Sequence, residues 1–218
     1  MNKKCPNCKL VNYADAEICA RCRSTLGGSA FLASNSSLLK SVFVRRALVC
    51  LLVVAVVIVG FYVSLVLTAK PLSYDQRKSV ESAISILEEK GFSDEVLLLK
   101  YLAVFRSNDN WLNASVEKEN AYAATNFPFE IMTLYEDFFT YPADEVERAA
   151  ILLHEAKHLQ GKDEKEAYEF VWKNRKKLGW VRSKYQSSII WNDVRKQTKE
   201  YAPHLFVCDV NPFGDCTE

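Results

Sequence analysis

The longest uninterrupted hydrophobic segment of the chain runs from Ala47 to Ala69. It follows a pair of arginines, ends before a lysine and contains no charged residue. A segment of this length is sufficient to cross a bilayer once as a helix, and a helix buried in a soluble core rarely has apolar residues on every face. A cleaved signal peptide fits less well, because a cysteine-rich module precedes the segment. We therefore expect a single transmembrane helix.

Helical spacing of apolar residues dominates the remainder of the chain. In 75–90, apolar residues recur every three or four positions, and the segment ends at Gly91, a residue typical of helix ends. Between Asp144 and Gly161, acidic residues lie near the start of another predicted helix, where the helix dipole favours them. Further helices are expected over 95–105, 164–177 and 182–200. The sequence predicts a mostly helical domain with little sheet.

The N-terminal segment carries a regular cysteine pattern, Cys5-x-x-Cys8 and Cys19-x-x-Cys22. Each pair can place two thiolates on one side of an ion, and four thiolates suit a structural zinc with no position left for water. The alternative is two disulfides or a redox pair, although so short a segment has almost no core and needs a metal to fold. The run resembles the short zinc-ribbon family found at the N-terminus of many bacterial proteins.

A second motif, HEAKH, lies in the helix expected between Asp144 and Gly161. His154 and His158 are four residues apart, so on a helix both imidazoles face the same side and can bind one ion. Glu155 lies beside them and can take a proton from a water on that ion. The chain has only three histidines, and two of them form this motif. The alternative is two ordinary histidines on an amphipathic helix.

A catalytic zinc usually takes three protein ligands and keeps one position for water. The segment resembles two families of zinc peptidase, and both imply Glu164 as the third ligand. In the metzincins, His158-x-x-Gly161-x-x-Glu164 would return the chain to the metal. In the gluzincins, the ligand is the Glu of an E-x-x-A on the next helix, here 164–167. A metzincin would carry His or Asp at this position and a later Met-turn, so the gluzincin resemblance fits better.

Other acidic residues near the motif leave the third ligand open. The alternatives are Asp163, Glu166 and Glu169, and any of these acids could instead belong to a solvated helix start. Lys157 occupies an interior position of the motif that zinc peptidases usually leave uncharged.

The segment before the motif alternates in the manner of a strand. Phe127, Phe129, Ile131 and Thr133 alternate with their neighbours, and Pro128 confines such a strand to a sheet edge or to its own start. The zinc-peptidase resemblance implies that an edge strand here holds an extended peptide by strand addition. The alternative is a loop and a short helix that pack on the motif's helix.

The resemblance implies hydrolysis of peptide bonds by a zinc-bound water, with Glu155 as the general base. A partner for the oxyanion is also needed, and by chemistry Tyr168, Tyr185 and His204 are candidates. The alternative function is a non-catalytic, membrane-tethered protein that binds a metal or a partner, or acts as a sensor.

Charge and cysteine distribution predict the orientation. Residues 1–46 carry eight Lys or Arg against two acidic residues, whereas 69–218 carry twenty against twenty-five. Basic segments stay in the cytoplasm, and thiols spaced for zinc suit a reducing compartment. Cys208 and Cys216 could close a disulfide outside. We expect a cytoplasmic N-terminus and a periplasmic or extracellular C-terminal domain in the cell membrane.

A basic cluster follows the motif and consists of Lys173, Arg175, Lys176 and Lys177. It is interpreted as a solvated helix face, with lipid headgroups or an acidic substrate as the functional alternative.

Together these patterns predict a multidomain, single-pass membrane protein whose main domain is mainly α (α+β) and zincin-like. Its expected parts are a zinc ribbon at 1–26, a flexible linker at 27–46, a transmembrane helix at 47–69 and a metallopeptidase domain at 70–218. The expected cofactors are two Zn²⁺, one structural and one catalytic. The expected partners are the membrane, a peptide or protein substrate, and a cytosolic protein for the ribbon. The net charge of +1 gives no reason to expect nucleic acid.

Overall fold

The computed structural model describes residues 2–26, 42–115, 122–126, 128–208 and 214–217. The chain divides into two compact units, Met1–Val57 and Ile58–Glu218. Most of the predicted linker falls on 27–41, outside the described residues. Its last five residues, 42–46, belong to the first helix instead.

Short antiparallel pairings build the N-terminal part of the first unit. β1 (Lys3–Lys4) pairs with β2 (Val11–Asn12), and an isolated bridge joins Ile18 to Thr25. Each pairing closes a loop that contains one of the two cysteine pairs. Only Cys5 and Cys19 are buried hydrophobic residues in this segment, so apolar packing contributes little to its stability.

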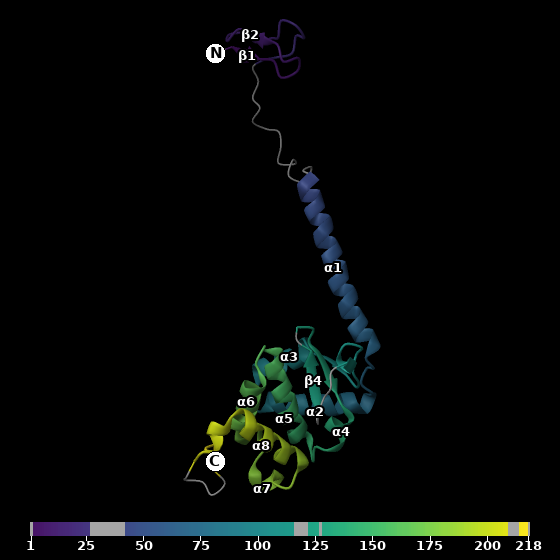
Figure 1. Ribbon diagram of the computed structural model, residues 1–218, viewed down its shortest axis with the longest axis vertical. Coiled ribbons are helices and arrows are strands. Elements are labelled where there is room, and N and C mark those ends of the chain that lie inside the picture. Colours follow the sequence, from purple (N-terminus) through teal and green to yellow (C-terminus); the bar gives the residue numbers. More distant parts are fainter. Residues whose placement is uncertain (1, 27–41, 116–121, 127, 209–213, 218) are drawn as a thin grey trace. The chain divides into compact units, whose positions relative to one another are not determined.

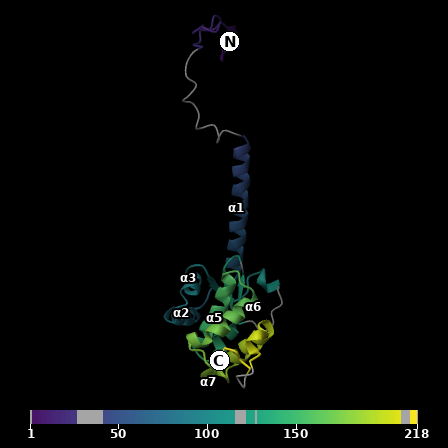
Figure 2. The same cartoon turned by 90° about the vertical axis from the view of Figure 1, so that its left-hand side faces the viewer.

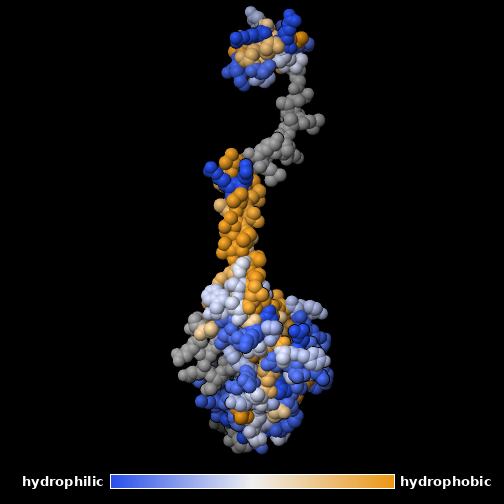
Figure 3. Space-filling model, turned by 90° about the vertical axis from the view of Figure 1, so that its right-hand side faces the viewer, coloured by the Kyte–Doolittle hydropathy of each residue, from blue (hydrophilic) through white to orange (hydrophobic). Residues whose placement is uncertain are grey.

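A single helix, α1 (Val42–Thr68), contains all of the predicted apolar run of 47–69 except its last residue, Ala69. Among the described residues it is the one helix long and apolar enough to cross a membrane, by length and composition. Apolar side chains cover its visible face in Figure 3, with hydrophilic residues near its N-terminal end. The helix begins five residues before the predicted span, at Val42.

The second unit is mainly helical with one small sheet, which confirms the predicted class at this coarse level (Figure 1). Its first helix, α2 (Tyr74–Glu89), begins with a capping box between Ser73 and Gln76. The other helices are α3 (Ser93–Tyr101), η2 (Asn113–Ser115), α4 (Glu136–Thr140), α5 (Glu145–Leu159), α6 (Glu164–Leu178), α7 (Arg182–Tyr185), α8 (Ile189–Tyr201) and η3 (Pro203–Phe206).

Two predicted helices differ from the observed ones. The helix expected over 95–105 ends at Tyr101, because residues 104–106 leave it to pair with a strand far along the chain. The helix expected over 182–200 is interrupted between α7 and α8, where the Ser188 hydroxyl accepts the Trp191 N–H and caps a new helix.

The sheet has three strands in the order β3-β5-β4: β3 (Val104–Arg106), β5 (Ile131–Leu134) and β4 (Ala123–Asn126). β5 runs parallel to β3 and antiparallel to β4. Of the strand predicted over 127–134, Phe127 lies outside the described residues, 128–130 form a turn, and only Ile131–Leu134 form a strand, which is central rather than at the edge. All four of its side chains are fully buried, as a central strand covered on both faces requires. The two outer strands of the sheet are β3 and β4.

α5 is the central element of the second unit. It packs against α2, α3, α6 and β4, as Figures 1 and 2 show from two sides. Its neighbour α6 contributes Trp172, which meets Trp180 and Trp191 in a buried aromatic cluster. Arg175, expected on a solvated face, is 1% exposed and pairs with Asp215 at 2.9 Å. That part of the basic-cluster interpretation is wrong, because the C-terminal segment folds back over α6.

Candidate metal centres

The two cysteine pairs of the first unit sit in loops of the same backbone form. The Cys5 N–H donates to the Leu10 carbonyl at 2.8 Å, and the Cys19 N–H donates to the Ser24 carbonyl at 2.8 Å. In each loop the residue after the second cysteine has a positive φ, 62° and 55° respectively. This left-handed conformation is uncommon outside glycine, so the two loops share the same unusual backbone turn.

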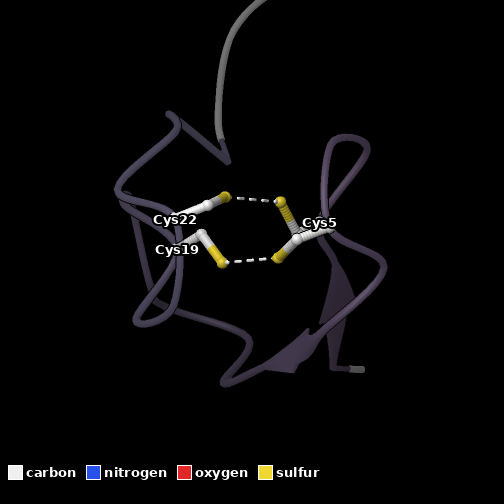
Figure 4. Close-up of side chains that lie close together, drawn as sticks. Cys5, Cys19 and Cys22 are labelled. Atoms are coloured by element: carbon white, nitrogen blue, oxygen red, sulfur yellow. Dashed lines mark hydrogen bonds between the residues drawn. The ribbon is translucent and has the colours of Figure 1, made fainter.

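The four sulfur atoms converge on one point. Cys5 and Cys22 Sγ are 3.6 Å apart, Cys8 and Cys19 Sγ are 3.4 Å apart, and all four lie within 4.8 Å of one another. Figure 4 shows Cys5, Cys19 and Cys22 directed at a common centre. Tetrahedral zinc with bonds of about 2.3 Å would hold its sulfurs about 3.8 Å apart. The cluster could hold a metal ion and is compatible with the predicted zinc ribbon.

Electrostatics favour a cation at the cysteine cluster. The backbone N–H of Cys8, followed by the Ser24 hydroxyl, lowers the pKa of the Cys5 thiol to about 6. A backbone hydrogen bond from Leu10 lowers the pKa of Cys8, but burial and the neighbouring thiols outweigh it and raise that pKa to about 12. Negative sulfurs crowded in this way repel one another, and a divalent cation would relieve the repulsion.

The second candidate centre is built at the C-terminal end of α5. Asp144 caps the start of this helix by accepting the N–H groups of Val146 and Glu147. The helix stops at Leu159, and Gly161 follows with φ of 74°, as the sequence predicted. The turn that Gly161 permits brings the start of α6 back against the histidines.

His154, His158 and Glu164 offer three ligand atoms at one point. The two Nε2 atoms are 3.0 Å apart, and the Glu164 carboxylate oxygens lie 3.2 Å from His154 Nε2 and 3.4 Å from His158 Nε2. Bonds of about 2.1 Å to tetrahedral zinc place neighbouring ligand atoms about 3.4 Å apart. The three residues could therefore hold one metal ion and would leave a coordination position open.

Neighbouring groups prepare these side chains for a cation. His158 Nδ1 lies 2.9 Å from the Lys162 carbonyl, which orients the ring and directs Nε2 toward the other two ligands. The two histidines hold the pKa of the Glu164 carboxyl well below its usual range, so it is a carboxylate. Burial lowers the pKa of His158, but Glu164 and the Glu155 charge outweigh it and raise that pKa to about 9.

The alternative acidic ligands are engaged elsewhere. Asp163 caps α6, Glu166 pairs with Lys162 at 2.8 Å, and Glu169 pairs with Lys173. Of the four acids considered from the sequence, only Glu164 belongs to the cluster.

Glu155 lies beside the cluster and is held by a hydrogen bond. It is 6% exposed, and its Oε2 accepts the Thr125 hydroxyl of β4 at 2.7 Å. Glu155, His154 and Glu164 line one cavity of about 230 Å³. The second carboxylate of the site thus faces the same space as the metal ligands.

Lys157 turns away from the cavity. Its ammonium pairs with Glu95 of α3 and lies 3.4 Å from the centre of the Phe170 ring. Both charged side chains of the pair are under 10% exposed. The charged residue within the motif therefore joins α5 to α3 and α6 and leaves the site free of a competing cation.

Of the three proposed oxyanion partners, Tyr168 is the one that lines the cavity. Its ring centre is 4.3 Å from that of His154. Burial, and then the charges of Glu164 and Glu155, raise its pKa, so the hydroxyl keeps a proton to donate. Tyr185 instead donates to Asp144 at the far end of α5, and His204 is exposed beside Glu169.

Several cavity residues were not predicted. Tyr122 donates its hydroxyl to Asp193, and Tyr201 stacks on Tyr168 with ring centres 5.4 Å apart. Tyr122 directly precedes β4, and Asp193 and Tyr201 belong to α8, so all three are distant from the motif in sequence. No local spacing signals them, so only the tertiary fold could reveal them.

The last two cysteines are joined. Cys208 and Cys216 form a disulfide, and Asp215 beside it accepts hydrogen bonds from Trp172 and Arg175. This covalent loop fixes the C-terminal segment against α6, the helix that carries Glu164.

The chain was also compared with known proteins. No family model matches it, and neither a curated protein nor a solved structure is significantly similar to it. The functional conclusion therefore rests on the residues and geometry of the two candidate centres.

Proposed function

We propose that the protein is a membrane-anchored zinc metallopeptidase. The observation that carries this proposal is the convergence of His154, His158 and Glu164 at one point, with Glu155 in the same cavity. Two imidazoles and one carboxylate form the ligand set of catalytic zinc sites that keep one position open. A carboxylate next to an open position is what a hydrolase needs in a general base.

The residues divide the chemistry among them. His154, His158 and Glu164 would hold Zn²⁺, which makes a water acidic enough to act as a nucleophile near neutral pH and polarises the substrate carbonyl. Glu155 would accept a proton from the attacking water and pass it to the leaving amine. Thr125 fixes one oxygen of Glu155, so the other can face the reacting proton. Tyr168 donates a hydrogen bond to the developing oxyanion.

β4 is suited to hold the substrate. It is an edge strand of the sheet, and it contacts α5 at the site. Ala123 and Tyr122 line the cavity, and Thr125 contacts Glu155. An extended peptide added along the free edge of β4 would pass the metal ligands with its backbone paired.

Composition and cysteine chemistry support the anchoring and the orientation. We propose that α1 crosses the membrane, that the cysteine cluster holds a structural Zn²⁺ in the cytoplasm, and that the second unit lies outside. The disulfide between Cys208 and Cys216 suits an oxidising compartment, and the four clustered thiols suit a reducing one. A cytosolic protein would be the partner of the ribbon.

Zinc content tests the metal part of the proposal. We expect two zinc ions per full-length chain purified in detergent, and one in His154→Ala or Glu164→Ala, because the cysteine cluster keeps its own ion. Two matched controls should retain both ions. They are His204→Ala, which removes the third histidine, and Glu166→Ala, which removes an acid of the same helix turn. A second ion that survives Glu164→Ala would contradict the ligand assignment.

Hydrolysis of a mixed set of fluorogenic peptides tests the catalytic part. Glu155→Gln should keep two zinc ions and lose activity by about 10²-fold or more, because the base can no longer accept a proton. Full activity in Glu155→Gln would overturn the mechanism. A wild-type chain that holds both ions but cleaves no peptide would favour the non-catalytic, membrane-tethered metal-binding protein.

Proteolysis of intact cells tests the orientation. An external protease should degrade the second unit and spare a tag at the N-terminus. The reverse pattern would contradict the proposed orientation.

A further inference from the structure

The last two turns of α1 are part of the second unit's packing. Leu65 is fully buried, and the Phe61 ring meets the rings of Trp111 and Phe129 with centres 5.7 and 5.3 Å apart. The Trp111 indole N–H donates to the Ser64 hydroxyl at 3.2 Å. The domain therefore holds the helix from Phe61 onward.

This packing shortens the part of the helix that is free to enter lipid. From Ala47, the first residue after the arginines, to Gly60 there are fourteen residues. At a rise of about 1.5 Å per residue they extend about 21 Å. The hydrocarbon core of a bilayer is about 30 Å thick. If only these fourteen residues lay in lipid, they would span roughly two thirds of the hydrocarbon core of an ordinary bilayer.

The face of α1 that points away from the domain remains apolar beyond Gly60. Val63 is 42% exposed and Leu67 is 77% exposed, so they lie beside the domain without being covered by it. A bilayer of ordinary thickness would cover both of these side chains. It would then also reach the part of the domain level with them, where Trp111 is 49% exposed.

α3 carries a second group of exposed apolar residues. Leu97, Tyr101 and Leu102 are 58%, 83% and 44% exposed, and they lie on or directly after the helix. α3 leads into β3, whose last residue, Arg106, donates from Nε to the Val66 carbonyl of α1 at 3.4 Å. Figures 1 and 2 both place α3 at the end of the second unit where α1 enters it.

We propose that the second unit rests on the bilayer, with the exposed faces of α3 and of the last two turns of α1 seated among the lipid headgroups and upper acyl chains. The partner of this surface is lipid, because large aromatic and aliphatic side chains at the level of a membrane-helix end match the interfacial zone. The inference rests on the membrane-anchoring part of the proposed function and not on peptidase activity.

Trp111 provides a direct test, because it is the one exposed tryptophan: Trp172, Trp180 and Trp191 are at most 3% exposed. The full chain is reconstituted in phosphatidylcholine vesicles with and without brominated acyl chains, which quench tryptophan at short range. We expect brominated lipid to reduce the wild-type emission, and to leave the emission of Trp111→Phe nearly unchanged. Equal quenching of the two proteins would overturn the proposal.

A matched pair of reporters keeps the test independent of Trp111. In the Trp111→Phe background, Leu97→Trp places a reporter on α3, and Ile189→Trp places one at an apolar position that is similarly exposed, 52%, on α8. Brominated lipid should quench the first and spare the second. If brominated lipid quenches neither reporter and alkaline carbonate fails to extract the chain from the vesicles, the proposal that the second unit rests on the bilayer is overturned, whereas the membrane anchoring stands. Extraction by carbonate would overturn both the seating and the anchoring.

Discussion

Lys157, which lies within the HEAKH motif, links α5 to its neighbour α3. Lys157 departs from the zinc-peptidase pattern, yet its side chain serves the fold, since it pairs with buried Glu95 against the Phe170 ring. The same part of α5 thus directs His154 and Glu155 to the cavity and Lys157 to Glu95 of α3. A buried pair of this kind is costly to break, because the remaining partner keeps its charge in a dry environment.

Lys157→Met should therefore destabilise the second unit by about 3–5 kcal/mol, because the Glu95 carboxylate loses its partner. The double variant Lys157→Met with Glu95→Gln should recover part of this loss. Chemical unfolding followed by tryptophan emission measures both. Lys173→Met is the control: it breaks an exposed pair with Glu169 and should cost less than about 1 kcal/mol. Equal losses for the two single variants would contradict the role of Lys157.

At the scale of the element, the start of α5 depends on the charge of Asp144. Burial raises the pKa of this carboxyl, but Lys184, the Tyr185 hydroxyl and the Glu147 N–H outweigh it and hold the pKa below its ordinary value of 3.8. A carboxyl with a lowered folded pKa stabilises the fold above its unfolded pKa, and the effect is lost as the pH falls through the folded pKa.

Asp144→Asn tests this, because asparagine still caps a helix but carries no charge. We expect the variant to be less stable than wild type by about 1 kcal/mol or less at neutral pH. The difference should shrink below pH 3.8 and vanish once the wild-type carboxyl is protonated. Thermal unfolding at several pH values measures it. A difference that stays constant into acid would exclude the charge as its cause.

The C-terminal segment should stabilise α6 through its covalent loop. Cys208 and Cys216 are eight residues apart, and closing a loop of this size stabilises a fold by about 2–3 kcal/mol. Replacing both with serine should lower the unfolding free energy by about that amount. Cys50→Ser, which removes an exposed cysteine of α1, is the control and should leave it unchanged. An unchanged stability in the double variant would show that non-covalent contacts, such as those of Asp215 with Trp172 and Arg175, hold the segment without the disulfide.

Local signals predicted the helices well and the sheet poorly. α2, α5 and α6 carry their own caps and stops, such as Ser73, Asp144 and Gly161, so their bounds follow from the sequence. β3 was predicted as helix, since only its pairing with β5, about 27 residues along the chain, makes it a strand. The candidate site likewise combines residues that local signals predict with residues that only the fold brings together. The motif and Glu164 are signalled within a dozen residues. Only the fold brings Thr125 to Glu155, and only the fold brings Asp193 and Tyr201 to the cavity.

At the scale of the whole molecule, each unit carries its own candidate metal centre. The cysteine cluster lies within Met1–Val57, and the His154, His158 and Glu164 cluster lies within Ile58–Glu218. The two units are compact by themselves. The described part of the small first unit has almost no apolar core, so we expect it to need a bound metal to fold, whereas the second unit has a large apolar core of its own.

Loss of the first metal should therefore leave the second unit intact. All four tryptophans lie between Trp111 and Trp191, so tryptophan emission reports the second unit alone. Cys19→Ser should remove one of the two zinc ions, because three thiolates no longer close a tetrahedral site. It should leave the tryptophan-detected unfolding midpoint and the peptidase rate within error of wild type. Glu164→Ala should instead lose the ion of the second unit and retain the ion of the cysteine cluster. If Cys19→Ser shifted the tryptophan transition, the two units would be coupled in stability. Such a shift would contradict our expectation that the two candidate metal centres are independent of each other.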